Sequence, residues 1–254
     1  HVSPHSIMSV TFTNKAAREM RGRLEDLLDG NLVGNSRSMW VGTFHGIAHR
    51  LLKAHWKILN LPQNFQILDS DDQLRLVKRV CQTLKLDETK WPPRQAQSYI
   101  NSQKDEGQRP QYIQAGGDPY AVTMLQIYTA YEEICRSGGL VDFGELLLRA
   151  HELLLNNPDI LHHYQRRFPF ILVDEFQDTN TIQYAWLRVL AGNTGCVTAV
   201  GDDDQSIYGW RGAKIENIQR FTDDFKQSQT VRLEQNYRST GLILKAANGV
   251  IQNN

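Results

Sequence analysis

A short apolar run that ends on two adjacent acids limits most strongly how this chain can fold. Residues 168–174 read Phe-Pro-Phe-Ile-Leu-Val-Asp, and Glu175 follows directly. A continuous apolar run of this length is typical of a strand buried on both faces, as in a parallel sheet. Open α/β sheets bind ligands at the carboxyl ends of their strands. The run therefore predicts a parallel sheet with a candidate site at Asp174 and Glu175.

Other segments with strand composition flank this run. They are Ser6–Thr13, Met39–Thr43, Cys196–Gly201 and Thr230–Leu233. Helical patterns alternate with them, which favours a parallel sheet covered by helices on both faces. The first helices are expected at Asn14–Leu28 and about Phe44–Leu59, with a polar loop at Gly30–Ser38 between them.

The middle of the chain, from about Asp69 to Phe168, shows no strand pattern. Ser70–Gln73 has the form of a capping box and opens a helix that ends near Leu84. Further helices are expected from Pro92-Pro93, at about Pro119–Cys135 and at Asp142–Leu155. The fold class is therefore α/β, a partial parallel sheet with an inserted all-helical subdomain.

Composition excludes some classes of protein. Hydrophobic residues make up 41% of the 254 residues, and the longest apolar runs are far too short to span a membrane. Lys plus Arg and Asp plus Glu are both 28, but residues 1–58 hold eight basic and four acidic side chains, a weak sign of a phosphate-contacting face. The three cysteines lie far apart without a CxxC, which argues against a disulfide framework or a zinc site.

The acidic residues that end and follow the apolar run, from Asp174 to Asp178, form the strongest candidate for catalysis and are called the acidic run below. Phosphoryl transfer needs one carboxylate to hold Mg²⁺, often through water, and Asp174 suits this role. It needs a second group to orient or deprotonate the attacking water, and Glu175 suits that one. The alternative is a strand that ends in solvated acids, which Gln177 and Asp178 make less favoured.

A second candidate is the glycine-rich stretch Val200–Gly212. Gln205 could contact a terminal phosphate, and Arg211 a phosphate or another side chain. The rings of Tyr208 and Trp210 could stack on bases, a contact worth about 1–3 kcal/mol per base. The alternative is a turn whose Trp210 fills the core.

Two further candidates lie next to strands. After the last expected strand, Arg238 could stabilise developing phosphate charge and Tyr237 could stack on a nucleobase, unless Ser239 simply caps a helix. Near the amino terminus, two strand-to-helix junctions could form a floor for a nucleic-acid backbone, because helix N-termini present free N–H groups to phosphates. Ordinary capping with phenylalanines in the core is the alternative there. The candidate residues are Phe12, Thr13, Asn14, Lys15, Thr43, Phe44 and His45.

Taken in order, these motifs resemble those of superfamily 1A DNA helicases of the UvrD/Rep/PcrA group. The resemblance covers essentially the whole chain, and Trp91–Ala96 and Tyr99–Gly107 are most similar to the UvrD branch. The matching motifs are Ia at Val10–Ala17, Ib at Gly42–Gly46, II at Val173–Asp178, III at Gly201–Ala213 and IV at Gln235–Ser239.

The resemblance implies an ATP-driven motor that moves 3′ to 5′ on single-stranded DNA and unwinds duplexes. It implies ATP and Mg²⁺ as cofactors, single-stranded DNA, single-strand/duplex junctions and repair proteins as partners, and mismatch and nucleotide excision repair in the bacterial cytoplasm as the setting. Asp174 would position Mg²⁺, Glu175 would activate water, Gln205 and Arg238 would sense the γ-phosphate and Tyr237 would pack on adenine. DNA bases would meet Phe12, Tyr208 and Trp210, and the backbone would pass Asn14, Thr43 and His45.

The same resemblance divides the chain into domains. Residues 1–66 and 168–234 would form one RecA-like domain (1A), residues 67–167 its helical insertion (1B), and residues 235–254 the start of a second RecA-like domain (2A).

One motif of the family is missing. The sequence contains no GxxxxGK[ST] phosphate loop, whose backbone N–H groups and Lys hold the β- and γ-phosphates. We therefore expect a helicase fragment that binds and hydrolyses no ATP alone, with an exposed apolar face that favours dimers. The alternatives are a non-catalytic module that binds single-stranded DNA or a repair partner, and a helicase–nuclease subunit, although no nuclease carboxylate cluster is visible.

Overall fold

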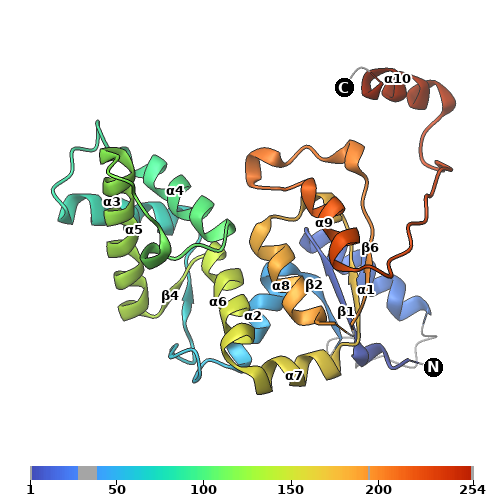
Figure 1. The fold of residues 1–254 in the computed structure, drawn as a ribbon, viewed down its shortest axis with the longest axis horizontal. Coiled ribbons are helices and arrows are strands. Elements are labelled where there is room, and N and C mark those ends of the chain that lie inside the picture. The colour runs from blue at the N-terminus through green and yellow to red at the C-terminus, as the bar shows by residue number, and fades with distance from the viewer. Residues whose placement is uncertain (1, 28–38, 194, 253–254) are drawn as a thin grey trace.

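A four-stranded parallel sheet forms the core of one lobe of the computed structural model, which describes residues 2–27, 39–193 and 195–252 (Figure 1). The strand order is β2-β1-β5-β6, and every pairing is parallel. The expected α/β fold is confirmed. The strands are β1 Ile7–Thr11, β2 Trp40–Thr43, β5 Phe170–Val173 and β6 Cys196–Ala199.

Helices cover this sheet and build the second lobe. After β1 and β2 come α1 Asn14–Leu27 and α2 Phe44–Ala54, and after β5 and β6 come α8 Thr181–Ala191 and α9 Glu216–Asp224. The chain between β2 and β5 forms α3 Ser70–Thr83, α4 Pro93–Asp105, α5 Pro119–Gly138, α6 Phe143–Asn156 and α7 Pro158–Arg167. Short 3₁₀ turns are η1 Pro4–Ser6, η3 Pro110–Tyr112, η4 Phe176–Asp178, η5 Asp203–Gln205 and η6 Gly209–Arg211, and α10 Gly241–Ile251 is the last helix.

The apolar side chains form two separate cores. In the sheet lobe, the register pairs Met8 with Ile171 and Val10 with Val173, and all four are buried against helices that include α2, α6 and α8. In the helical lobe, α3, α4 and α5 share a second core. Helices α6 and α7 lie within the expected insertion 67–167, yet their apolar side chains belong to the first core. The division into domains remains a prediction.

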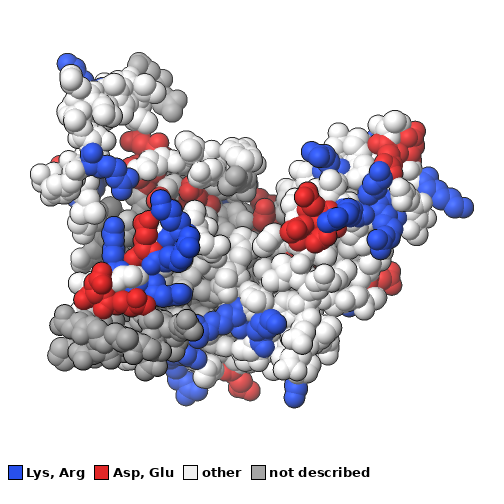
Figure 2. All heavy atoms as spheres, turned by 180° about the vertical axis from the view of Figure 1, so that it is seen from behind, with Lys and Arg blue, Asp and Glu red and all other residues white. Residues whose placement is uncertain are grey.

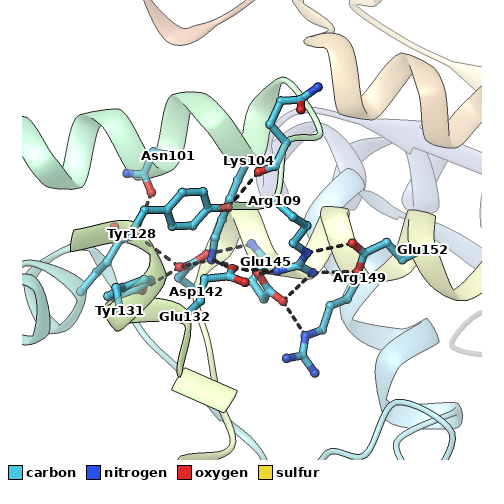
Figure 3. Close-up of polar contacts among 12 residues, drawn as sticks. Asn101, Lys104, Arg109, Tyr128, Tyr131, Glu132, Asp142, Glu145, Arg149 and Glu152 are labelled. Atoms are coloured by element: carbon cyan, nitrogen blue, oxygen red, sulfur yellow. Dashed lines mark hydrogen bonds and ion pairs between the residues drawn. The ribbon is translucent and has the colours of Figure 1, made fainter. Parts of the chain in front are cut away.

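A buried ion network fixes α4, α5 and α6 to one another (Figure 3). The Lys104 ammonium group lies 2.8 Å from Asp142 Oδ2 and 2.9 Å from Glu145 Oε2, and its side chain is only 1% exposed. Arg109 donates two hydrogen bonds to Glu145, at 2.8 and 2.9 Å. Asp142 also caps α6 by accepting from the N–H of Glu145.

The network compensates charges that burial would otherwise destabilise. Burial lowers the pKa of Lys104, but Asp142 and Glu145 outweigh it and raise that pKa above its usual value. Burial alone would raise the pKa of Glu145, whereas Lys104 and Arg109 hold it well below its usual range. Each charge therefore stays ionised because its partners remain beside it.

Two arginine side chains cover the outer edge of β2. Arg21 Nη2 donates to the carbonyl of Val41 at 2.6 Å, and Arg50 Nη1 donates to the carbonyl of Met39 at 3.0 Å. The Arg50 guanidinium also lies over the Trp40 ring, 4.4 Å from its centroid. One carbonyl group of this edge strand and the carbonyl of the residue just before it are thus satisfied by side chains instead of another strand.

Two expectations about strands were wrong. Thr230–Leu233 forms no strand: it lies away from the sheet, so its backbone has no partner, and Val231 and Leu233 are 78% and 88% exposed (Figure 1). The helical block does contain a strand, β4 Leu140–Val141, which pairs with β3 Gln66–Ile67 and is too short to show a period.

Two expectations about helices also differ from the structure. The sequence did not predict helix α7, and α2 ends before the turn at Asn60, whose φ is 52°. The expected loop at 30–38 lies outside the described residues.

Part of the apolar surface is open to solvent. Leu172 of β5 is 37% exposed and Val200, just after β6, is 52% exposed. The last helix, α10, stands apart from both lobes, with Leu242 83% exposed (Figure 1). An exposed apolar face was expected, and dimerisation through it stays a prediction. None of the described helices has both the length and the apolarity needed to cross a membrane.

We expect Lys104→Met to lower the free energy of unfolding by about 3–5 kcal/mol, because the buried carboxylates of Asp142 and Glu145 would lose a partner. The matched control is Lys15→Met, since Lys15 forms only an exposed 4.0 Å pair with Glu19. That control should change stability by less than about 0.5 kcal/mol. Urea unfolding measures both, and equal effects would contradict the stabilising role of the network.

Candidate functional site

A cleft of about 1250 Å³ brings together residues from four of the five sequence motifs. Its lining combines aromatic rings, side-chain amides and carboxylates, and includes no Lys or Arg among the described residues. The aromatic rings are Phe12, Phe44, His45, Phe143 and Tyr208, the amides are Gln73, Asn101, Gln177, Asn180, Gln183 and Gln205, and the carboxylates are Asp105, Glu175, Asp178 and Asp204.

The two strand-to-helix junctions supply the aromatic floor. Thr13 Oγ1 accepts from the N–H of Ala16 at 3.0 Å, and Thr43 Oγ1 accepts from the N–H of Gly46 at 3.1 Å, so both threonines cap helices. These caps set Phe12 beside Phe44, with ring centroids 5.3 Å apart.

The floor residues differ in exposure. Phe44 is 1% exposed and supports the floor from below, whereas Phe12 is partly exposed. Burial lowers the pKa of His45, whose ring meets Phe143 edge-on at 5.9 Å. His45 therefore enters the cleft as a neutral ring. Asn14 and Lys15 are exposed on the first turn of α1, outside the cleft lining.

The acidic run and the glycine-rich stretch are joined by a chain of hydrogen bonds. Gln177 Nε2 donates to Glu175 Oε2 at 2.7 Å, and Gln177 Oε1 accepts from the N–H of Asp202 at 3.1 Å. Gln205 Nε2 then donates to Asp202 Oδ2 at 2.6 Å. The structure thus connects Glu175 and Gln205 through Gln177 and Asp202. The linking role of Gln177, which is 1% exposed, was missed.

Glu175 has an unusual backbone. Its φ is 52°, in the left-handed region that non-glycine residues rarely adopt. This conformation turns the chain directly after β5 into η4. Strain at such a position is typical of functional sites.

Two carboxyl groups at this edge, those of Asp174 and Asp178, have pKa values above their usual range. Burial and the neighbouring Glu175 charge raise the pKa of Asp174. The same two causes raise the pKa of Asp178, whose Oδ1 is buried without a hydrogen-bond partner among the described residues. The hydroxyl of Thr11, at the end of the adjacent β1, is also buried without a hydrogen-bond partner among the described residues.

The carboxylate oxygens at this edge are of the kind that Mg²⁺ binds. Hard oxygen atoms are its preferred ligands, and Mg²⁺ keeps several waters when one or two carboxylates hold it. No cluster of three or more metal-ligating side chains occurs within residues 2–27, 39–193 and 195–252. The donor set therefore suits an ion held largely through water by Asp174.

Other expected site residues are not gathered here. Tyr237 is 86% exposed, and both it and Arg238 lie on the segment after α9 that leaves the sheet lobe (Figure 1). Trp210 is 75% exposed, so the alternative in which it fills the core is wrong. The Trp210 ring centroid lies 6.5 Å from that of Tyr208. Arg211 ends η6, and its side chain lies outside the described part of the chain.

Asp105, at the end of α4, was not anticipated as a cleft residue. Its Oδ1 accepts from Asn180 Nδ2 at 3.0 Å, and Asn180 caps α8 through a capping box. Burial raises the pKa of Asp105 to about 6, and the charges of Glu106 and Asp142 contribute to the rise. Nothing in the sequence distinguishes Asp105 from other acids on helix surfaces, because its partner is 75 residues away.

The raised pKa of Asp105 predicts a pH-dependent stability. The folded chain holds this proton more tightly than the unfolded chain, in which the pKa is about 3.9, so ionised Asp105 lowers the free energy of unfolding as pH rises through about 6. We expect Asp105→Asn, which keeps an acceptor for Asn180, to raise that free energy by about 1–2 kcal/mol near pH 8 and hardly at all near pH 4. Urea unfolding at both pH values measures this, and an equal change at both would contradict it.

Comparison with known proteins places the sequence in a family. Residues 1–226 match the UvrD/REP helicase N-terminal domain family. The chain is 66% identical to DNA helicase II of Escherichia coli (strain K12) over 253 residues, 99% of this chain and 34% of that protein. It is 58% identical to DNA helicase II of Haemophilus influenzae over 100% of this chain and 35% of the relative, and 42% identical to ATP-dependent DNA helicase PcrA of Leuconostoc citreum over 100% and 34%.

The chain spans about a third of the length of these curated relatives. The family match nevertheless covers most of the chain, including both strand-to-helix junctions, the acidic run and the glycine-rich stretch. The chain therefore belongs to the UvrD/REP helicase family, as part of the region that this family's N-terminal domain describes.

Proposed function

We propose that this chain is part of an ATP-dependent DNA helicase and that it binds single-stranded DNA in the cleft between its lobes. The observation that carries the proposal is the convergence of Phe12, His45, Glu175, Gln205 and Tyr208 on one cleft. The names of its relatives, DNA helicase II and PcrA, support the same activity.

The lining of the cleft favours bases over phosphates. Four carboxylates and no described Lys or Arg line it, so a phosphate backbone on the floor would be repelled. Aromatic rings and side-chain amides suit base faces and base edges instead. The face seen in Figure 2 carries Lys and Arg interspersed with Asp and Glu, not one unbroken basic surface. We therefore orient the strand with its bases toward Phe12 and Tyr208.

The acidic run supplies the groups for ATP hydrolysis. Asp174 would hold Mg²⁺ through water, and bound Mg²⁺ would neutralise charge on the phosphates. Glu175, oriented by the amide of Gln177, would take a proton from the attacking water. Gln205 would contact the terminal phosphate. Tyr237 and Arg238 would reach the nucleotide only with the segment after α9 placed differently, since both lie away from the acidic run.

Finer features follow from family membership alone. We extend to this chain 3′-to-5′ movement, duplex unwinding at junctions, mismatch and nucleotide excision repair with their protein partners, and a cytoplasmic setting in bacteria. We also retain the division into 1A, 1B and 2A at residues 67, 168 and 235.

Tyr208→Ala should weaken binding of a fluorescein-labelled oligothymidylate by about tenfold, because one stacking contact is lost. Fluorescence anisotropy measures the affinity. The matched control is Tyr112→Ala, which removes a 72% exposed tyrosine from η3, outside the cleft. Equal effects of the two substitutions would count against DNA binding in the cleft.

ATP hydrolysis by the chain is the second test, with and without oligonucleotide and with Glu175→Gln as the contamination control. Because the printed sequence contains no GxxxxGK[ST] motif to hold the phosphates, we expect no ATP turnover above that control. DNA binding without turnover is also what the alternative of a non-catalytic binding module predicts for this chain. Turnover that Glu175→Gln abolishes would show that another element holds the phosphates.

A further inference from the structure

Two acids at the end of α4 reach from the helical lobe to the segment that carries Tyr208 and Trp210. Glu106 Oε1 lies 3.0 Å from Lys214 Nζ, and Glu106 Oε2 accepts from Thr181 Oγ1 at 2.9 Å. Asp105 accepts from Asn180 at 3.0 Å. The last turn of α4 therefore contacts both the start of α8 and the residue that follows the glycine-rich stretch.

The glycine-rich stretch itself has little apolar support. Ile207 is 69% exposed and Trp210 is 75% exposed, and neither belongs to a core. Its first end is held by the bond from Asp202 N–H to Gln177. Its other end is held by Lys214, whose N–H donates to the carbonyl of Thr179 at 2.9 Å. The position of the stacking rings therefore depends on how these two ends are fixed.

The end of the glycine-rich stretch that precedes Lys214 lies next to α4. Gly212 has a φ of 86°, and a Cβ added there would lie 3.6 Å from Asp105 Oδ2 and 3.9 Å from Asn180 Cβ. The turn after Trp210 thus lies within van der Waals reach of the end of α4. Thr179, which accepts from Lys214, is itself held by the buried amide of Asn217 at 3.0 Å.

The end of α4 is a rigid anchor. Lys104 immediately precedes Asp105 and is fully buried in the ion network of Figure 3. Asp105 and Glu106 follow Lys104 directly in the chain, and each accepts a hydrogen bond from a residue at the start of α8. Glu106 can therefore transmit the position of the helical lobe to Lys214.

We propose that Glu106 and Lys214 are positioning residues for nucleic-acid binding, because their ion pair holds the Tyr208–Trp210 segment in place beside the cleft. This inference rests on the proposed function of the cleft. Neither residue lines the cleft itself.

The charge of Glu106 makes the proposal testable by the sign of an effect. Removing a negative charge near a polyanion site tightens binding when only long-range electrostatics act. Removing a positioning contact weakens binding. Glu106→Gln therefore distinguishes the two by direction as well as by size.

The experiment measures oligothymidylate affinity for Glu106→Gln, Lys214→Gln, the double variant and the charge-exchanged variant E106K/K214E. We expect each single substitution to weaken binding about fivefold, a partial loss of stacking. The double variant should be no weaker than either single one, and charge exchange should restore most of the affinity. The matched control is Glu88→Gln, which breaks the similarly exposed 3.4 Å pair with Lys78 and should change nothing.

Tighter or unchanged binding by Glu106→Gln would overturn the proposal, and so would further loss on charge exchange, which would mean that Lys214 contacts phosphate directly. A second measurement needs no DNA. Amide hydrogen exchange of a peptide covering 208–214 should be faster in Glu106→Gln, because the N–H groups of Ala213 and Lys214 are bonded there. If the wild-type chain binds no oligonucleotide, the proposed function fails, while unchanged exchange would overturn the positioning role.

Discussion

Lys104 carries an ammonium group on a side chain that is 1% exposed, and its charge is tolerated because Asp142 and Glu145 lie within 2.9 Å. Moving one of these helices would separate the charges in a medium of low dielectric constant, where separation is costly. Helices α4, α5 and α6 are therefore fixed in one arrangement. Since α6 also packs in the core of the sheet lobe, the same network sets where the helical lobe stands relative to the sheet. The cleft is lined by residues from both lobes, among them Phe12 of the sheet lobe and Asn101 of the helical lobe.

The cleft separates two kinds of chemistry within a short distance. In the proposed function, the rings and amides of its floor bind a strand of bases, and the acidic run at its β5 edge binds a nucleotide and a metal ion. Gln177 lies between them and bonds to both Glu175 and Asp202. A change at the nucleotide edge would reach the glycine-rich stretch through two hydrogen bonds. The positive φ of Glu175 places its carboxylate at the start of this path.

Much of this arrangement was predictable from the sequence, for physical reasons that differ between elements. Strand β5 was found because a short apolar run bounded by polar residues is typical of a strand, and the acids after it were found because strand ends meet at one edge of a sheet. The expected burial of this strand on both faces was wrong, since Leu172 is 37% exposed. Helices α3 and α4 were found from their capping and proline signals. In contrast, Thr230–Leu233 has strand composition but no neighbouring strand, and β4 exists only because β3 lies beside it.

The site residues divide in the same way. Phe12, Glu175, Gln205 and Tyr208 were proposed from their type and their place after a strand, and the structure places all four in the lining of the cleft, while their roles stay predictions. The contacts of Gln177, Asp105 and Glu106 were not anticipated. The partners of Asp105 and Glu106 on α8 are each 75 residues away. No local pattern can reveal such a contact.

The two edges of the sheet are unequal, and this limits how the sheet can associate. At the outer side of β2, Arg21 and Arg50 already donate to the carbonyl groups of Val41 and Met39, which an added strand would otherwise use. On the opposite side, β6 has no neighbouring strand among the described residues. A sheet with two open edges can add copies without end, whereas a sheet with one open edge can accept a single partner and then stops. The side chains of Arg21 on α1 and Arg50 on α2 therefore leave β6 as the edge of the described sheet at which a further strand can pair.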